Sequence, residues 1–189
     1  MSQTLYAAGW AYVALCAWVL VRSNGPLPSH AATAPYGGPA GEWFSGMKPY
    51  CNAVEVEVQQ QHRPAPATVE GAGYSAACFA LAGKIERARG VIDRLDPADR
   101  AGAAGIVFNV GHPVADAGDD QSAGPIMRLV VEYQPDNYMA LYHAGMSEYI
   151  LGQPDLARTH LEAFLARYAS EDGWRANALE VLQRITAGR

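Results

Sequence analysis

Apolar residues between positions 42 and 187 recur every three or four residues, and breaks interrupt this pattern at regular distances. Such spacing is typical of amphipathic α-helices, each of which has one apolar face. Three of the breaks contain a glycine, and these glycines are separated by 35 and 34 residues. A period of about 34 residues predicts an all-α stack of helix–turn–helix units. The three glycines are Gly83, Gly118 and Gly152.

The residues around each glycine also repeat. A small residue follows five positions after the glycine, and a large apolar residue follows four positions later. The small residues are Ala88, Ala123 and Ala157, and the large ones are Ile92, Met127 and Leu161. Before each glycine, an apolar residue is followed three positions later by a pair that ends in a small residue: Ala72 with Ser75-Ala76, Val107 with Val110-Gly111, and Leu141 with Ala144-Gly145.

This pattern, which covers residues 69–168, resembles the tetratricopeptide repeat family. The resemblance implies a TPR-like superhelix of about three helical hairpins that binds other proteins. It also implies that Gly145 and Ala157 lie where the two helices of a hairpin cross, since a larger side chain there would push the helices apart.

The chain departs from the family pattern at three positions. Glu148 stands where the family prefers tyrosine, and Pro113 and Pro125 lie inside the second unit. Proline removes a helical hydrogen bond and clashes with the preceding turn. We therefore expect the second unit to be kinked or shortened, with Pro125 as the first residue of its second helix.

Further helices are expected on both sides of the repeats. Residues 47–60 have the pattern of an isolated helix, and residues 172–187 have that of an amphipathic helix whose polar face caps the stack. Asn137, which follows Pro135, is a suitable N-cap for the next helix.

The N-terminal segment is expected to anchor the chain in a membrane. Residues 5–21 carry no charge, and seventeen helical residues span roughly 26 Å, slightly less than a hydrocarbon core. A cleaved signal peptide remains the alternative, although no Lys or Arg precedes the apolar run. One face of the segment carries small residues that would allow close packing against another membrane helix, namely Ala7, Ala11 and Ala14.

Three parts of the chain are therefore predicted: a transmembrane anchor at 1–22, a linker at 23–41 and a helical repeat domain at 42–189. The linker contains four prolines and four glycines and has no helical period, so it is expected to be an extended tether. Positively charged residues beside a membrane helix favour the cytoplasmic side, so Arg22, taken by itself, would place the domain in the cytoplasm. Because N-terminal anchors more often carry their domains outward, we expect a periplasmic domain on a bacterial-type inner membrane.

Two interpretations of Cys51 and Cys78 stay open. As free thiols they would be small buried hydrophobic residues, which is the interpretation we favour from sequence. A disulfide between them requires a domain exported to an oxidising compartment. Cys16 lies within the apolar N-terminal segment and is not a suitable partner for either.

Charge and composition exclude some functions. The formal net charge is −5, and the basic residues do not cluster, which argues against a nucleic-acid surface. The chain has no CxxC, GxSxG, HExxH or phosphate-loop motif. We therefore predict no enzymatic activity, no cofactor and no metal.

The resemblance also implies which residues line the inner face of the superhelix. In the versions of the family that clamp a terminal carboxylate, lysine and asparagine occupy these positions, and none of them matches here. An aromatic and Met-rich groove is expected instead, although several of these side chains could pack between hairpins as core. The positions are Phe108, His112, Asp116, Met139, Tyr142, Met146 and Tyr149.

The segment 112–120 combines one histidine with three aspartates. His112 and Asp116 would share a helical face, so a metal site is conceivable. However, the segment lacks the alternate ligand spacing of an EF-hand loop. Since aspartate commonly caps helices, a solvated turn with an N-cap is the favoured interpretation.

Three functions are compatible with these features. The first is an accessory subunit of a membrane protein complex, for example of respiratory or photosynthetic type. The second is an assembly factor that binds client proteins transiently. The third, a small metal-dependent hydrolase that uses His112 and the neighbouring aspartates, has no catalytic motif to support it.

Overall fold

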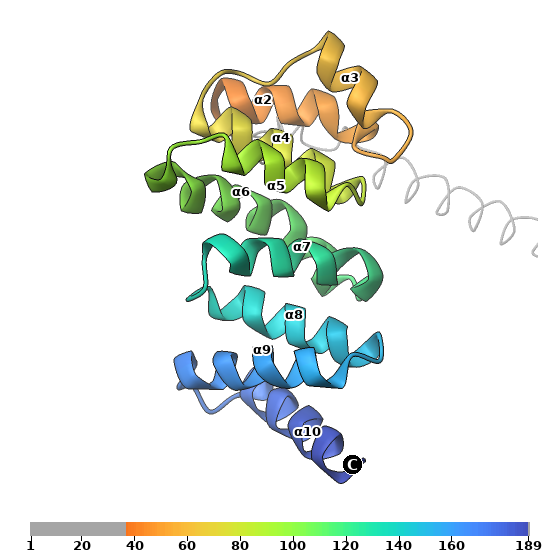
Figure 1. Ribbon diagram of the computed structural model, residues 1–189, viewed down its shortest axis with the longest axis vertical. Helices are drawn as coiled ribbons and strands as arrows, with labels where there is room; N and C mark the ends of the chain where they lie inside the picture. The colour runs from red at the N-terminus through yellow and green to blue at the C-terminus, as the bar shows by residue number, and fades with distance from the viewer. Residues whose placement is uncertain (1–36, 189) are drawn as a thin grey trace, which may run out of the picture. The chain divides into compact units, whose positions relative to one another are not determined.

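The computed structural model describes residues 37–188, and within this range the chain is helical and contains no strand. This confirms the predicted all-α class for the described residues. The helices, shown in Figure 1, are α2 (Gly38–Met47), α3 (Val56–His62), α4 (Val69–Leu81), α5 (Ile85–Asp93), α6 (Pro97–Asp116), α7 (Asp120–Tyr133), α8 (Tyr138–Ile150), α9 (Pro154–Arg167) and α10 (Gly173–Ala187), with a 3₁₀ turn η1 (Lys48–Tyr50) after α2.

Three helical hairpins form the centre of the domain. They pair α4 with α5, α6 with α7, and α8 with α9, in the order of the sequence. Each hairpin turns at one of the periodic glycines, and Gly83, Gly118 and Gly152 have φ angles of 72°, 77° and 73°. Residues that carry a Cβ rarely adopt this left-handed backbone conformation, so the turns require glycine. The predicted positions of the turns are confirmed.

The hairpins stack into an extended array that runs from α2 at one end to α10 at the other (Figure 1). Neighbouring hairpins pack through α4 against α6 and through α7 against α8. A bidentate ion pair adds to the first of these junctions, because Arg89 of α5 lies 2.7 Å from both carboxylate oxygens of Glu132 on α7. One cluster of buried apolar residues spans the first two hairpins and reaches α8, and a second cluster joins α8, α9 and α10.

Small residues allow the two helices of a hairpin to approach closely. A Cβ placed on Gly145 of α8 would lie 2.7 Å from Cγ of Leu161 on α9 and 3.2 Å from the carbonyl oxygen of Ala157. In the preceding hairpin, a Cβ on Gly111 would lie 2.6 Å from Cγ2 of Ile126. Both glycines thus lie at helix crossings, which was expected for Gly145.

The expectation that Pro125 is the first residue of a helix in the second hairpin is wrong. Helix α6 is twenty residues long and contains Pro113, while α7 begins at Asp120 and contains Pro125 in its interior. Asp119, rather than the proline, defines the start of α7, because its side chain accepts a hydrogen bond from the backbone N–H of Ser122. Pro113 is the seventeenth residue of α6 and Pro125 the sixth of α7, so each removes a helical hydrogen bond without ending its helix.

The region before the hairpins differs from the single helix expected over 47–60. Helix α2 begins at Gly38, inside the segment 23–41 that was expected to be an extended linker, and ends at Met47. The chain then bends before α3. Pro39 near the start of α2 already has the backbone angle of a helix, and burial of Phe44 against the Tyr74 ring, 5.1 Å away, stabilises the helix.

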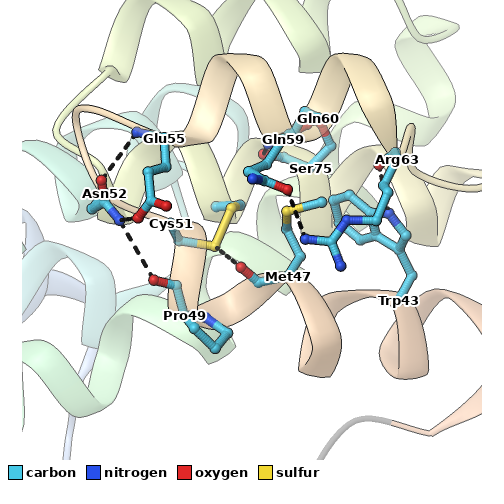
Figure 2. Close-up of a disulfide and its surroundings, with 11 residues drawn as sticks. Trp43, Met47, Pro49, Cys51, Asn52, Glu55, Gln59, Gln60, Arg63 and Ser75 are labelled. Atoms are coloured by element: carbon cyan, nitrogen blue, oxygen red, sulfur yellow. Dashed lines mark hydrogen bonds between the residues drawn. A yellow bond between two sulfur atoms is a disulfide. The ribbon is translucent and has the colours of Figure 1, made fainter.

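A disulfide joins Cys51, which follows η1, to Cys78 of α4, with their Cα atoms 4.8 Å apart. This bond overturns the favoured interpretation of two free buried thiols. In Figure 2 the bond lies beside Met47, whose carbonyl oxygen is 3.5 Å from Sγ of Cys51. By closing a loop of 27 residues, the disulfide attaches the N-terminal helices to the first hairpin, an effect worth about 3–4 kcal/mol in models of chain entropy.

The C-terminal helix completes the stack as predicted. The Asp172 side chain caps α10, and Ala178, Val181 and Ile185 are buried against the last hairpin. The predicted cap at Asn137 is also present, because its side chain accepts a hydrogen bond of 3.0 Å from the backbone N–H of Ala140.

Over residues 37–188, none of the helices is both long enough and apolar enough to cross a membrane. The expected anchor at 5–21, with Ala7, Ala11 and Ala14, lies outside the described residues, as does most of the expected linker.

We predict that Gly145→Leu destabilises the domain by about 1–3 kcal/mol, because the new side chain would overlap Leu161 at the helix crossing. Urea unfolding followed by circular dichroism measures this change. Gly102→Leu is the matched control, because a Cβ at this exposed position of α6 would have only one neighbour within 4 Å, Val69 at 3.9 Å. Equal stability of the two variants would show that Gly145 tolerates a side chain.

Candidate protein-binding face

The residues expected to line the inner face lie on α6 and α8, which are the first helices of the second and third hairpins. Phe108, His112 and Asp116 project from α6, and Met139, Tyr142, Met146 and Tyr149 project from α8. The Phe108 ring stacks on the His112 ring with 4.9 Å between centroids and 20° between planes. Phe108, Met139, Met146 and Tyr149 are half-buried, whereas Asp116 is exposed.

Tyr142 does not belong to an open groove. Its side chain is only 5% exposed, and its ring lies edge-on to Phe164 of α9 at 5.1 Å and to Trp174 of α10 at 4.8 Å. Helix α10 thus covers this part of α8, and Tyr142 is part of the core. Met146 and Tyr149 pack at the edge of the same core cluster. The open part of the predicted face is therefore smaller than expected.

An open apolar depression of about 580 Å³ lies where α6 faces the connection between α7 and α8. Phe108 and Met139 of the predicted face line it, together with Tyr133, Pro135 and Tyr138. Tyr138 is 43% exposed. On one side, Nε2 of Gln134 donates a hydrogen bond of 2.6 Å to the carbonyl oxygen of Ala101 and fixes the connection against α6.

Sequence reasoning missed Tyr133 and Tyr138 because it considered only the positions carried over from the repeat family. A signal was nevertheless present, since two tyrosines flank the short turn through Pro135. A turn between packed helices lies at the surface, so aromatic residues beside it are exposed more often than those in mid-helix.

Two histidines and an aspartate meet at the junction between the second and third hairpins. The Nε2 atoms of His112 and His143 are 3.0 Å apart, and Oδ1 of Asp116 lies 3.6 Å from the first and 3.7 Å from the second. His143 is buried, and this burial, together with the positive charge that His112 can carry, lowers the pKa of His143 to about 4. Sequence reasoning had named His112 and Asp116 as candidates for a metal site but had not included His143 in it.

The other two aspartates of segment 112–120 have structural roles. Asp119 caps α7, as the favoured interpretation of this segment predicted. Asp120 accepts a hydrogen bond of 2.8 Å from the hydroxyl of Ser147 on α8. These contacts join the second hairpin to the third.

A buried carboxylate occupies the position where the family pattern has tyrosine. Glu148 is fully buried, and its Oε2 lies 2.6 Å from Nδ1 of His160 on α9. Its Oε1 lies 3.7 Å from a guanidinium nitrogen of Arg128 on α7, which is an ion pair without a hydrogen bond. The Glu148 side chain therefore links α8 to α9 and α7 through polar contacts, which an aromatic ring at this position could not make.

Comparisons of the chain with protein-family models, with curated proteins and with solved structures found no match.

We predict that His160→Ala destabilises the protein by about 3 kcal/mol, because it leaves the buried Glu148 carboxylate with only the distant Arg128 as a partner. Adding Glu148→Gln should restore part of this loss, since the amide carries no charge. Urea unfolding of the single and double variants measures the coupling between the two residues.

Glu162→Ala, at an exposed position on the same helix, is the control. If His160→Ala were no more destabilising than this control, the contact between His160 and Glu148 would not contribute to stability.

Proposed function

We propose that this chain is a TPR-like scaffold that binds other proteins as an accessory subunit of a membrane protein complex, and that it is not an enzyme. One observation carries the proposal. Three successive hairpins turn at glycines with positive φ that are 35 and 34 residues apart, and they stack into an extended array. Arrays of this kind present long surfaces to partner proteins.

The apolar depression beside Pro135 is the surface that we assign to the partner. Tyr138 offers an exposed aromatic ring, and Met139 adds a flexible thioether that adapts to different apolar side chains. Phe108 lines the depression from α6. Such a site suits a partner segment that inserts one or two apolar side chains. Asp136, which also lines the depression, is paired with Arg167 of α9 at 2.9 Å.

The disulfide supports a location outside the reducing cytoplasm. Structural disulfides persist in oxidising compartments such as the periplasm and are rare in the cytosol. A Cys51–Cys78 bond therefore agrees with a helical domain carried across a bacterial-type inner membrane. In this proposal the uncharged run at 5–21 is the single-pass anchor, and Ala7, Ala11 and Ala14 are the face that packs against a helix of the partner complex.

We predict that a photo-crosslinking amino acid placed at position 138 captures a stoichiometric partner in native membranes, whereas the same group at position 156 does not. Tyr138 borders the depression, while Leu156 lies on α9 with a similar exposure of 47% against 43%. Mass spectrometry of the crosslinked bands identifies what each position contacts.

A crosslink that forms equally well when the sample is irradiated after gentle detergent extraction supports a permanent subunit, because the partner has then stayed bound without the membrane. Crosslinks that appear only while client proteins are being synthesised would support the assembly-factor alternative instead. Equal crosslinking at positions 138 and 156 would remove the depression from the proposal.

We predict that the native protein keeps its N-terminal segment and carries an oxidised Cys51–Cys78 pair. An exported domain meets an oxidising environment, and an anchor is not removed. N-terminal sequencing measures the first point, and alkylation with and without prior reduction, read by mass spectrometry, measures the second. A mature chain that starts near Pro35 would identify the segment as a signal peptide, and free thiols at both positions would contradict an oxidising location.

A further inference from the structure

The contact between His112, Asp116 and His143 has no role in the protein-binding proposal and is independent of it. His112 and Asp116 are four residues apart on α6, so the helix places their side chains on one face. His143 reaches the same point from α8. One potential ligand atom from each residue, Nε2, Oδ1 and Nε2, lies within 4.8 Å of the other two.

The distances between these atoms match those of a metal site. The three sides of the triangle are 3.0, 3.6 and 3.7 Å, and the circle through its corners has a radius of about 2.0 Å. Bonds from zinc to histidine nitrogen and to carboxylate oxygen are about 2.0–2.2 Å long. An ion near the centre of the triangle would therefore reach all three atoms without movement of the backbone.

We propose that His112, His143 and Asp116 bind a divalent transition-metal ion of the zinc class. Two imidazoles and one carboxylate are ligands that zinc and its neighbours accept, whereas magnesium and calcium prefer oxygen ligands alone. Three protein ligands leave at least one coordination position for water or for a donor group from another molecule.

The surroundings of the three residues favour a cation. Asp116 contributes one negative charge directly, and the carboxylate of Asp120 also acts on His143. Without a metal, only one proton fits between the two Nε2 atoms, so one imidazole donates to the other. A bound ion replaces that single proton and is held by three groups rather than two.

Metal binding at this position would join two hairpins. His112 and Asp116 belong to the second hairpin and His143 to the third, so the ion would bridge a junction that is also held by packing, by the bond between Asp120 and Ser147 and by the ion pair of Arg128 with Glu148. A ligand that binds only the folded protein stabilises it. Zinc should therefore raise the unfolding temperature of the chain.

The test uses the full-length chain, stripped of metal with a chelator and then titrated with Zn²⁺ alone. We expect one Zn²⁺ per chain by calorimetry and a rise in the thermal midpoint. Co²⁺ should give the visible absorption of a low-coordinate site with nitrogen ligands. His112→Gln and His143→Gln should each lower the affinity by at least about tenfold, since loss of even an outer-shell partner costs about 10- to 100-fold.

Two matched controls separate ligand loss from general effects. His62→Gln removes an exposed histidine at the end of α3, and Asp119→Asn removes the same charge as Asp116→Asn while keeping an acceptor for the cap of α7. Both controls should bind Zn²⁺ like the original chain, whereas Asp116→Asn should bind it more weakly. If His143→Gln fails to fold, His112→Gln and Asp116→Asn decide the question, because these side chains are not fully buried.

The absence of stoichiometric Zn²⁺ and Co²⁺ binding to the original chain would overturn the proposal. Binding that His112→Gln and Asp116→Asn leave unchanged would overturn it as well, because the ion would then lie elsewhere.

Discussion

Close approach of two helices within each hairpin is the constraint on which the rest of the domain depends. At the crossings, Gly111 and Gly145 leave no room for even a Cβ, because Ile126 and Leu161 of the facing helices occupy that space. This contact sets the separation of the helices in a hairpin. The separation in turn determines which side chains are buried between hairpins and which remain at the surface, including those around the depression beside Pro135.

The two ends of the array are completed in different ways. At the C-terminal end, α10 covers the last hairpin with apolar side chains and buries Tyr142 in doing so. At the N-terminal end, α2 packs on α4, and a covalent bond between Cys51 and Cys78 adds to that packing. Short helices such as α3, with seven residues, have little surface to bury, so a crosslink is an effective way to hold them.

Several polar contacts join the second and third hairpins. The bond between Asp120 and Ser147, the contact between His112 and His143, and the buried Glu148 with Arg128 all connect these two hairpins. Packed apolar surfaces tolerate small sliding motions, whereas directional polar contacts specify one arrangement. This junction also borders the depression, because the Phe108 ring that lines the depression stacks on the His112 ring.

The sequence alone determined the features that depend on local spacing. The helical period, the turns at Gly83, Gly118 and Gly152, the small residues at the crossings and the cap at Asn137 all follow from residues close together in the chain. Only the tertiary structure decided which side chains meet across helices. Three contacts join residues that are at least 27 positions apart in the chain. They are the packing of Tyr142 against Trp174, the disulfide between Cys51 and Cys78, and the contact between His112 and His143. Periodicity predicts the face of a helix, but the neighbour that covers this face is set by how the helices pack.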